Sequence, residues 1–248
     1  MKSKKVDVHS YAIQALPHLG RILKENQSNL ERIVKRLVAD VSQGRSLFVF
    51  GSGHSALFSF ELYHRAGGAS FVIPMVADFM LPSAGPSMVR VFERTSSSAL
   101  PLLSRSGIKK GEMLWICSQS GINAAGVELA LEAKKRGFYT VAFTSIKHSQ
   151  GVESRHPSGG RLFEICDTVV DLMGEQGDAV VKVAPGLNAG PLSSLSAIFL
   201  GNSIITAAVA QLESRGIRCV YISVNTPEGE ARNKSIEKRA AMRDPLLR

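Results

Sequence analysis

Short apolar runs alternate with helix-patterned segments along most of the chain. Each apolar run is flanked by glycine or polar turn residues, as buried strands of parallel sheets are. We predict strands over residues 47–50, 70–74, 113–117, 139–144, 168–172 and 218–224. Apolar residues at helical spacing predict helices over residues 56–66, 123–136 and 193–215. This alternation predicts an α/β fold whose mostly parallel sheet is covered by helices on both faces.

The first 45 residues carry a helical pattern of their own. Apolar positions recur at helical spacing between residues 8 and 41, and Pro17 is expected to start or kink a helix there. The apolar stripe from Ile22 to Val41 fits either a dimer surface or packing within the domain. We divide the chain into a helical extension (1–45), the α/β domain (46–225) and a C-terminal tail or helix (226–248), all in one folded unit.

Two stretches lack a regular pattern and are predicted to be irregular loops. Residues 76–110 contain Pro82, Gly85 and Pro86, and residues 145–161 contain His148 and His156. Long loops at the strand ends of an α/β domain commonly form lids or binding loops, and a poorly ordered insertion is the alternative. Ligands of such sheets bind at the carboxyl ends of the strands.

The excess of positive charge lies at the two ends of the chain. The formal net charge is +9, but residues 46–212 carry thirteen Lys or Arg against twelve Asp or Glu. Residues 1–45 carry nine against four, and residues 213–248 carry eight against five. Aromatic residues are not interleaved with the basic ones and zinc-finger spacing is absent. We therefore expect solvated terminal helices and no nucleic-acid partner.

The sequence also argues against a membrane or secreted protein. Lys2, Lys4 and Lys5 are followed by polar residues, without the apolar core of a signal peptide. The most apolar long stretch, residues 195–212, is interrupted by Asn202 and Ser203 and is expected to be a buried helix. Three well-separated cysteines without C-x-x-C spacing suit a reducing compartment. We expect a cytoplasmic protein that does not bind a membrane.

Two hydroxyl-rich turns each follow a predicted buried strand. They read "GSGHS" at residues 51–55 and "SQSGIN" at residues 118–123. Glycines let a ligand approach the backbone, and the first turn of the following helix offers unpaired N–H groups to an anion. Neighbouring strands would bring both turns to one small anion, and hydroxyls without a lysine suit a reversibly bound phosphate monoester. The alternative is a pair of ordinary turns with serine as helix N-cap.

Familiar cofactor loops do not fit this sequence. The first turn lacks the Lys-Ser/Thr ending of a nucleoside triphosphate loop. Asp78 lies beyond Pro74, where it does not fit the acidic residue of a dinucleotide-binding unit. The histidines and cysteines never fall at the spacing of metal ligands. We expect neither a cofactor nor a metal.

A strand followed by "GSGHS" and a helix, and about sixty residues later a strand followed by "SQSG" and a helix, resembles the sugar isomerase (SIS) domain. The "SQSG" at residues 118–121 matches one common form of the family's S-x-S-G phosphate loop. The longer string "GSGHS…E…RAGG" is similar to a bacterial branch of stand-alone SIS proteins. The resemblance covers roughly residues 30–225. It implies a flavodoxin-like three-layer sandwich with a mostly parallel five-stranded sheet, a phosphorylated sugar as ligand, and a homodimer or higher homo-oligomer.

The resemblance also assigns residues to the ligand. The residues implied to hold the phosphate, together with nearby backbone amides, are Ser55, Ser118, Ser120 and Asn123. The residues implied to line the same pocket are Ser52, Gly53, His54, Gln119 and Gly121. Thr144 and Ser145 follow at the end of the fourth strand, where the family often contacts the sugar.

Aldose–ketose isomerisation needs ring opening and a base that moves a proton between adjacent carbons. Glu61 is the candidate base because it lies six residues after Ser55, about 9 Å along a helix. Its alternative role is a helix-surface ion pair with Arg65. SIS isomerases often place this glutamate one or more turns later, where this chain has Arg65 and then Gly68. His54 is the candidate for ring opening.

The remaining candidates are possible sugar contacts. His64 lies on the same predicted helix as Glu61, and its alternative is a partly buried core histidine. Glu93 and Arg94 form either a lid pair over the pocket or a solvated ion pair. The resemblance nominates Glu230 and Asn233 as residues that complete a neighbouring subunit's site, and a plain C-terminal helix start is the alternative.

We expect the protein to isomerise a phosphorylated sugar through an enediol. One rival is a non-catalytic phosphosugar sensor, which keeps the serine turns but does not need Glu61. A second rival is a lyase acting on a phosphorylated amino sugar ether, which would also use a glutamate on the rim of the pocket.

Overall fold

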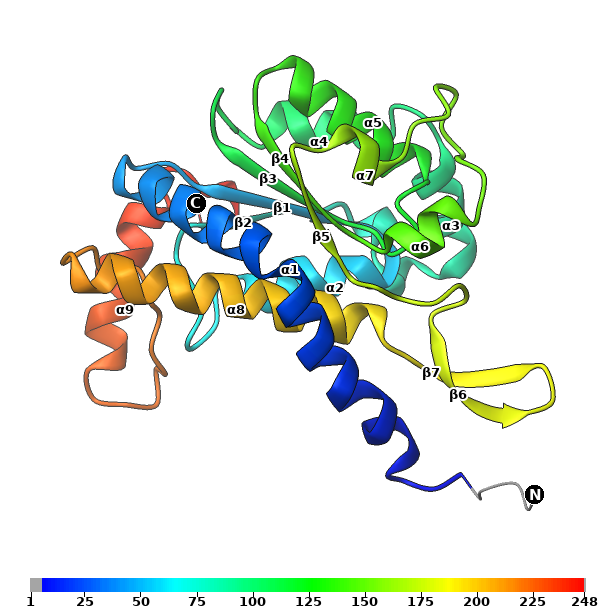
Figure 1. The fold of residues 1–248 in the computed structure, drawn as a ribbon. Helices are drawn as coiled ribbons and strands as arrows, with labels where there is room; N and C mark the ends of the chain where they lie inside the picture. Colours follow the sequence, from blue (N-terminus) through cyan, green and yellow to red (C-terminus); the bar gives the residue numbers. More distant parts are fainter. Residues whose placement is uncertain (1–5, 248) are drawn as a thin grey trace.

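The structure, a computed structural model, describes residues 6–247. Its centre is a five-stranded sheet in which all neighbouring strands are parallel (Figure 1). The strand order is β2-β1-β3-β4-β5. The strands are β1 (Leu47–Gly51), β2 (Val72–Met75), β3 (Met113–Cys117), β4 (Tyr139–Thr144) and β5 (Thr168–Asp171). This sheet confirms the predicted α/β fold and five of the predicted strands.

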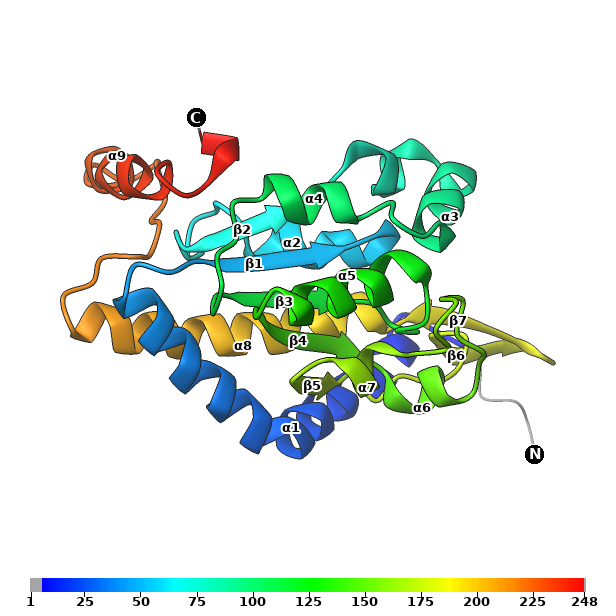
Figure 2. The ribbon, with the colours of Figure 1, turned by 90° about the horizontal axis from the view of Figure 1, so that it is seen from above.

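Alternate residues of each strand pack on opposite faces of the sheet. Leu47 and Val49 belong to one apolar core, and Phe48 and Phe50 belong to the other. Helices cover both faces (Figure 2), so β1 and β3 are buried along their whole length. A strand with two buried faces needs apolar residues at every position, which explains the continuous apolar runs of the sequence.

One face of the sheet is covered by α1 (Ser10–Ser42), α2 (Ala56–Leu62) and α8 (Ser193–Ser214). α1 continues unbroken through Pro17, which lies inside the helix and does not start it. The apolar stripe of α1, which includes Ile22, Ile33 and Leu37, is buried in the core of the same chain. These residues therefore serve packing within the domain.

α8 is the one helix among residues 6–247 that is long and apolar enough to cross a membrane, with a mean hydropathy of 1.6 over its most apolar 18 residues. Half of that stretch is buried within the domain, where α8 packs against α1 and α2. A core helix of a globular domain has this same length and composition. The placement matches the buried helix predicted from the sequence.

The other face of the sheet carries α4 (Leu100–Arg105), α5 (Ala124–Lys135) and α7 (Leu162–Ile165), while α3 (Pro86–Arg94) and α6 (Ile146–Gln150) lie near the carboxyl ends of the strands. The prediction of an irregular loop over residues 76–110 is therefore wrong. Besides α3 and α4, this region contains the short 3-10 turns Asp78–Met80 and Pro82–Ala84. Its prolines stand in the first turn of these elements, where a missing N–H breaks no hydrogen bond.

Residues 218–224 do not form the predicted sixth strand. They make one isolated antiparallel bridge, between Ala69 and Val220. An antiparallel hairpin of β6 (Ala179–Ala184) and β7 (Leu187–Pro191), which the sequence reading missed, projects from the domain instead. The Pro185-Gly186 dipeptide, a turn signal that follows a valine-rich run, was the available signal.

The C-terminal segment is fastened to the amino ends of the strands. After α9 (Gly229–Ala240) the chain returns to the sheet, where Arg243 contacts both carboxylate oxygens of Glu112 at 2.7 Å. Glu112 is 1% exposed and also accepts hydrogen bonds from the backbone N–H groups of Ser46 and Lys109. This carboxylate therefore joins three separate segments of the chain.

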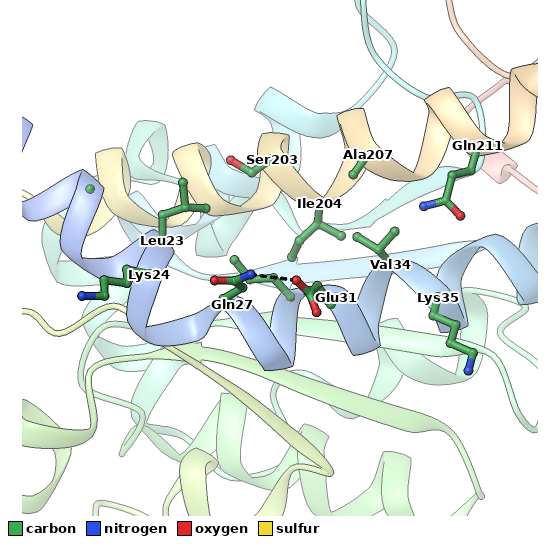
Figure 3. A pocket seen from close by; sticks show the side chains of 12 residues that line it. Leu23, Lys24, Gln27, Glu31, Val34, Lys35, Ser203, Ile204, Ala207 and Gln211 are labelled. Carbon is green, nitrogen blue, oxygen red and sulfur yellow. Dashed lines mark hydrogen bonds between the residues drawn. The ribbon is translucent and has the colours of Figure 1, made fainter.

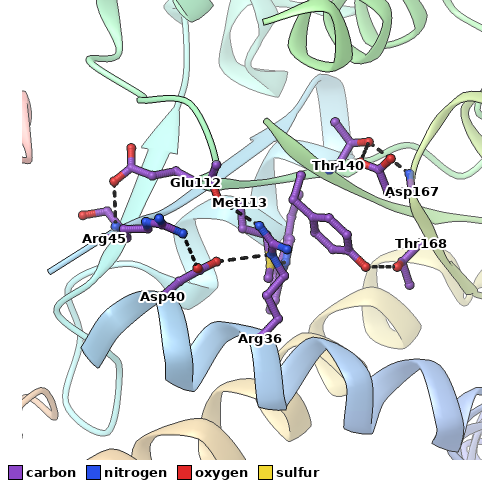
Figure 4. A network of polar contacts seen from close by, with 12 residues as sticks. Arg36, Asp40, Arg45, Glu112, Met113, Thr140, Asp167 and Thr168 are labelled. Atoms are coloured by element: carbon purple, nitrogen blue, oxygen red, sulfur yellow. Dashed lines mark hydrogen bonds and ion pairs between the residues drawn. The ribbon is translucent and has the colours of Figure 1, made fainter. Parts of the chain in front are cut away.

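A neighbouring set of polar contacts holds the end of α1 against the same edge of the sheet (Figure 4). Asp40 is buried and pairs with Arg45 at 2.8 Å and with Arg36 at 3.4 Å. Arg36 also donates to the carbonyl of Gly111. Buried charges are tolerated here because each one has a partner of opposite charge.

We predict that Arg243→Met lowers the free energy of unfolding by about 3 kcal/mol, because it leaves the buried Glu112 carboxylate without its counter-charge. Urea unfolding followed by circular dichroism measures this change. The control is Lys238→Met on the exposed side of α9, which should stay within about 0.5 kcal/mol of the parent. Equal stability of the two variants would contradict the assigned role of Arg243.

Candidate functional site

A pocket of about 680 Å³ opens at the carboxyl ends of β1 and β3. The two strands pair in register, with Gly51 opposite Cys117. Ser52 and Ser118, the next residue of each strand, therefore leave the same edge of the sheet at the same level. The two serine turns meet in this pocket, and their lining residues are Ser52, Gly53, His54, Ser55, Ser118, Gln119, Ser120 and Asn123.

The first turn is shaped by two glycines. A Cβ on Gly51 would lie 2.2 Å from the carbonyl oxygen of Ser55, so the backbone can fold back only over a residue without a side chain. Gly53 has φ +56°, in the left-handed region. Ser52 and Ser55 stand at the N-cap positions of the turn and of α2, but neither side chain forms the capping hydrogen bond. The N-cap alternative is therefore wrong for both serines.

The second turn is held from beneath by the end of β4. Thr144 Oγ1 donates to the carbonyl of Gln119 at 3.3 Å, and Ser145 donates its backbone N–H to the same carbonyl at 3.0 Å. Gly121 has φ +62°, and a Cβ there would lie 2.6 Å from Thr144 Oγ1. Thr144 and Ser145 are fully buried and Gly121 does not line the pocket. In this chain these three residues shape the turn from below.

One wall of the pocket is a face of α3. Pro86, Val89, Arg90 and Glu93 line it, at the spacing of one helix face. Burial raises the pKa of the Glu93 carboxyl above its ordinary value, while Arg94, Arg155 and hydrogen bonds with Asn123 and Ser52 act in the opposite direction. Glu93 is therefore a half-desolvated carboxylate beside both serine turns.

Positive charge reaches the pocket from two further arginines that the sequence reading did not single out. Arg90 stands one helical turn before Glu93, and Arg155 contacts Asn123 Oδ1 at 2.7 Å. Arg94, the predicted partner of Glu93 in a lid pair, is exposed and does not line the pocket. The spacing of Arg90 and Glu93 was a usable signal, but only once residues 86–94 were known to be helical.

The opposite wall comes from the loop before β6 and from the start of α8. Asp178 has φ +62° and accepts hydrogen bonds from Ser193 N at 2.8 Å and Ser193 Oγ at 2.5 Å, so it caps α8. Burial lowers the pKa of His148 below 6.5, opposed by the nearby Asp178 carboxylate. The neutral ring lines the pocket, and its Nδ1 is buried without a hydrogen-bond partner among the described residues.

Cys117 ends β3 directly below the pocket. Burial raises the pKa of its thiol to about 12, and a hydrogen bond with Ser55 only partly offsets this. The thiol is therefore neutral and is not a nucleophile near pH 7. Cys117, Cys166 and Cys219 are all free.

Several predicted site residues lie outside this pocket. Glu61, in the last turn of α2, forms an ion pair with Arg65, as the surface-pair alternative states, although Arg65 lies in the bend after the helix, which ends at Leu62 and not at residue 66. His64 instead contacts Glu237 of α9 at 2.9 Å. Glu61, Arg65 and His64 therefore have partners outside the pocket, and none of the three lines it.

The two C-terminal candidates also lie on α9, away from the pocket of their own chain. Asn233 is buried and bonds the backbone of Ile222 through both its amide nitrogen and its oxygen. Glu230 is exposed in the first turn of α9. Their proposed contact with a neighbouring subunit stays a prediction.

A second large hollow, of about 650 Å³, runs between α1 and α8 (Figure 3). Apolar residues such as Leu23, Val34 and Ile204 form half of its lining, and the other half is polar: Lys24, Gln27, Glu31, Lys35, Ser203 and Gln211. It lacks converging hydroxyls or backbone amides from a strand end. Among residues 6–247, no group of three or more His, Cys, Asp or Glu side chains could hold a metal ion. The serine-lined pocket is therefore the candidate site.

Comparison with known proteins agrees with this geometry. A family model of the SIS domain matches residues 10–145, a stretch that contains both serine turns. The chain belongs to the SIS domain family. It is 31% identical to a UPF0309 protein of Shouchella clausii, over 93% of this chain and 96% of that protein. It is also 31% identical to a UPF0309 protein of Brucella canis, over 96% of this chain and 97% of that protein.

Solved structures share the SIS fold at low sequence identity. Phosphoheptose isomerase GmhA from Neisseria gonorrhoeae matches 82% of this chain and 97% of its own, with a TM-score of 0.51 at 12% identity. A phosphoheptose isomerase from Francisella tularensis also gives a TM-score of 0.51, at 10% identity, over 82% of this chain and 96% of its own. These likenesses confirm the fold.

Proposed function

We propose that this SIS protein binds a phosphorylated sugar at the two serine turns and isomerises it between aldose and ketose. The observation that carries the proposal is the convergence of two hydroxyl-rich turns from paired strands in one pocket. The solved structures with TM-scores of 0.51 are phosphoheptose isomerases by name, which supports this reaction class.

The phosphate is bound by neutral donors inside the pocket and by two arginines at its rim. The hydroxyls of Ser55, Ser118 and Ser120 supply hydrogen bonds, and the unpaired N–H groups at the start of the following helices add a positive potential. Arg90 and Arg155 neutralise the remaining charge from the rim. Hydroxyls and two rim arginines hold the monoester firmly enough to orient it and still allow product release.

We assign the base to Glu93 in place of Glu61. A base must come within hydrogen-bond reach of the proton that it removes, and Glu93 lines the pocket while Glu61 pairs with Arg65 outside it. Burial of Glu93 raises its pKa and so makes its carboxylate a stronger base.

The reaction then proceeds without an external reductant or oxidant. His54 assists ring opening by relaying the proton of the anomeric hydroxyl to the ring oxygen, as the bond between C1 and the ring oxygen breaks. Glu93 then removes the proton on C2 of the open-chain aldose while O1 gains a proton from solvent, which gives an enediol. Glu93 returns its proton to C1 while O2 loses its proton to solvent, which gives the ketose. The products are the ketose and the restored carboxylate.

We predict that sugar phosphates raise the melting temperature and that the unphosphorylated sugars do not. A ligand present at 100 times its Kd adds about 2.7 kcal/mol to stability, which for a chain of this size is a shift of about 5–10 °C. A panel of aldose and ketose phosphates in a thermal-shift assay measures this. The double variant Ser55→Ala/Ser120→Ala should lose the shift. Equal protection by free sugars would refute phosphate recognition.

We predict that Glu93→Gln strongly lowers turnover and leaves binding intact. Removing a general base costs roughly 10²–10⁴-fold in rate, whereas the amide keeps the shape of the side chain. Exchange of the C2 hydrogen in heavy water, followed by NMR with the sugar phosphate that gives the largest thermal shift, reports the step directly. Glu61→Gln is the matched control and should exchange at the parent rate.

Other outcomes of the exchange experiment separate the competing functions. A sensor would bind the sugar phosphate without any exchange in the parent protein. A lyase would cleave a phosphorylated amino sugar ether and leave the simple aldose phosphates unchanged. Loss of exchange in Glu61→Gln, with full exchange in Glu93→Gln, would return the role of base to Glu61.

We predict that kcat/KM falls at low pH with a midpoint above 4.5. Glu93 must be ionised to act as the base, and its burial in the folded protein raises its pKa above that ordinary value. Protonation therefore removes activity at a higher pH than for a solvated glutamate. A profile from pH 4 to pH 8, with circular dichroism at each pH to confirm folding, measures the midpoint. A midpoint below 4.5 would exclude Glu93.

A further inference from the structure

A small pocket at the opposite end of the sheet is built around four arginines. It has a volume of about 140 Å³ and lies beside the amino ends of β1 and β2. All four charged residues that line it are arginines: Arg45, Arg218, Arg239 and Arg243. Ser46 and Ser70 also line it, and the rest of the wall is mostly apolar.

The fold brings the two basic ends of the chain together at this pocket. Arg45 follows the end of α1, Arg218 follows α8, and Arg239 lies in the last turn of α9. These segments belong to residues 1–45 and 213–248, which carry eight of the nine excess positive charges of the protein. The arginines of the two terminal segments come together only in the folded chain.

The charges of this pocket are only half balanced by the protein. Arg45 pairs with Asp40, and Arg243 pairs with Glu112. Arg218 and Arg239 form no ion pair within residues 6–247, and the Arg239 guanidinium donates to the backbone carbonyl of Arg218 at 2.7 Å. Arg243 Nε is buried and meets no acceptor among the described residues. Two guanidinium groups therefore lack a counter-charge, and a buried donor lacks a partner.

We propose that this arginine pocket binds an oxyanion of phosphate size. Guanidinium groups present paired N–H donors that match the oxygens of a phosphate. The volume accommodates one phosphoryl group and excludes a whole sugar phosphate. The ligand is inorganic phosphate or the phosphoryl end of a small metabolite, and it bridges α1, α9 and the segment after α8.

The arginine pocket is independent of the proposed catalytic site. The serine-lined pocket stands at the carboxyl end of β1 and the arginine pocket at its amino end, about 16 Å apart for a five-residue strand. Binding at the arginine pocket does not depend on the proposed isomerase activity.

The test is calorimetric titration with inorganic phosphate at constant ionic strength. The background protein carries Ser55→Ala/Ser120→Ala, so that phosphate binding at the serine turns does not contribute. In this background, Arg218→Gln/Arg239→Gln should raise the Kd for phosphate roughly 10-fold or more, because charge-assisted hydrogen bonds are lost.

The matched control is Lys234→Gln/Lys238→Gln, which removes the same charge from exposed positions of α9 and should leave the Kd unchanged. Arg243 is kept because Glu112 needs it.

The outcomes separate the sources of the ligand and the two proposals. A weaker phosphate isotherm in the presence of glucose 6-phosphate would identify a phosphoryl end as ligand. A phosphate isotherm that glucose 6-phosphate does not change would identify the free anion. Both results support the arginine pocket. Equal Kd values for the arginine and lysine variants would overturn it, as would no phosphate binding in the serine background. A change of oligomeric state in the arginine variant without a change in Kd would also overturn it. Failure of the serine variants to affect sugar phosphate binding would refute the proposed function alone.

Discussion

The parallel pairing of β1 with β3 is the constraint on which the site depends. With Gly51 opposite Cys117, both strands end at one level, and the chain can turn into a helix at the same place twice. Gly51 allows the first turn because no side chain fits beneath the Ser55 carbonyl. Gly121, Thr144 and Ser145 fix the second turn. The hydroxyls meet because two local turns are attached to one rigid pair of strands.

The sheet also separates the two proposed anion sites. At the carboxyl ends of the strands, hydroxyls and helix starts form a roomy pocket with Glu93 beside them, which suits a substrate that must arrive, react and leave. At the amino ends, arginines surround a space of about 140 Å³ in which little but an oxyanion fits. Glu112 and Asp40 balance part of that charge and hold α1 and the C-terminal segment against the sheet.

The sequence alone predicts the structure correctly where the local hydrophobic pattern and the tertiary environment favour the same element. Five buried strands are continuous apolar runs, and the two serine turns follow two of them.

The prediction was wrong where contacts between distant segments determine the local structure. Residues 218–224 have the apolar pattern of a strand because Cys219 and Tyr221 are buried. This segment nevertheless forms only one isolated bridge. Prolines that look like loop signals begin α3 and α4. Glu61 lies at the expected distance along the helix but not in the pocket, whereas Glu93 lines the pocket because α3 packs beside the two turns. Single-sequence spacing carries no information about that packing.

The most direct measurement is a crystal structure with a bound sugar phosphate. The account predicts a phosphorus atom between the two turns, with its oxygens within about 2.5–3.2 Å of the hydroxyls of Ser55 and Ser120. The carboxylate of Glu93 should face C1 and C2 of the sugar. A phosphate bound to only one turn, or a sugar bound elsewhere with the serine-lined pocket vacant, would contradict the central claim.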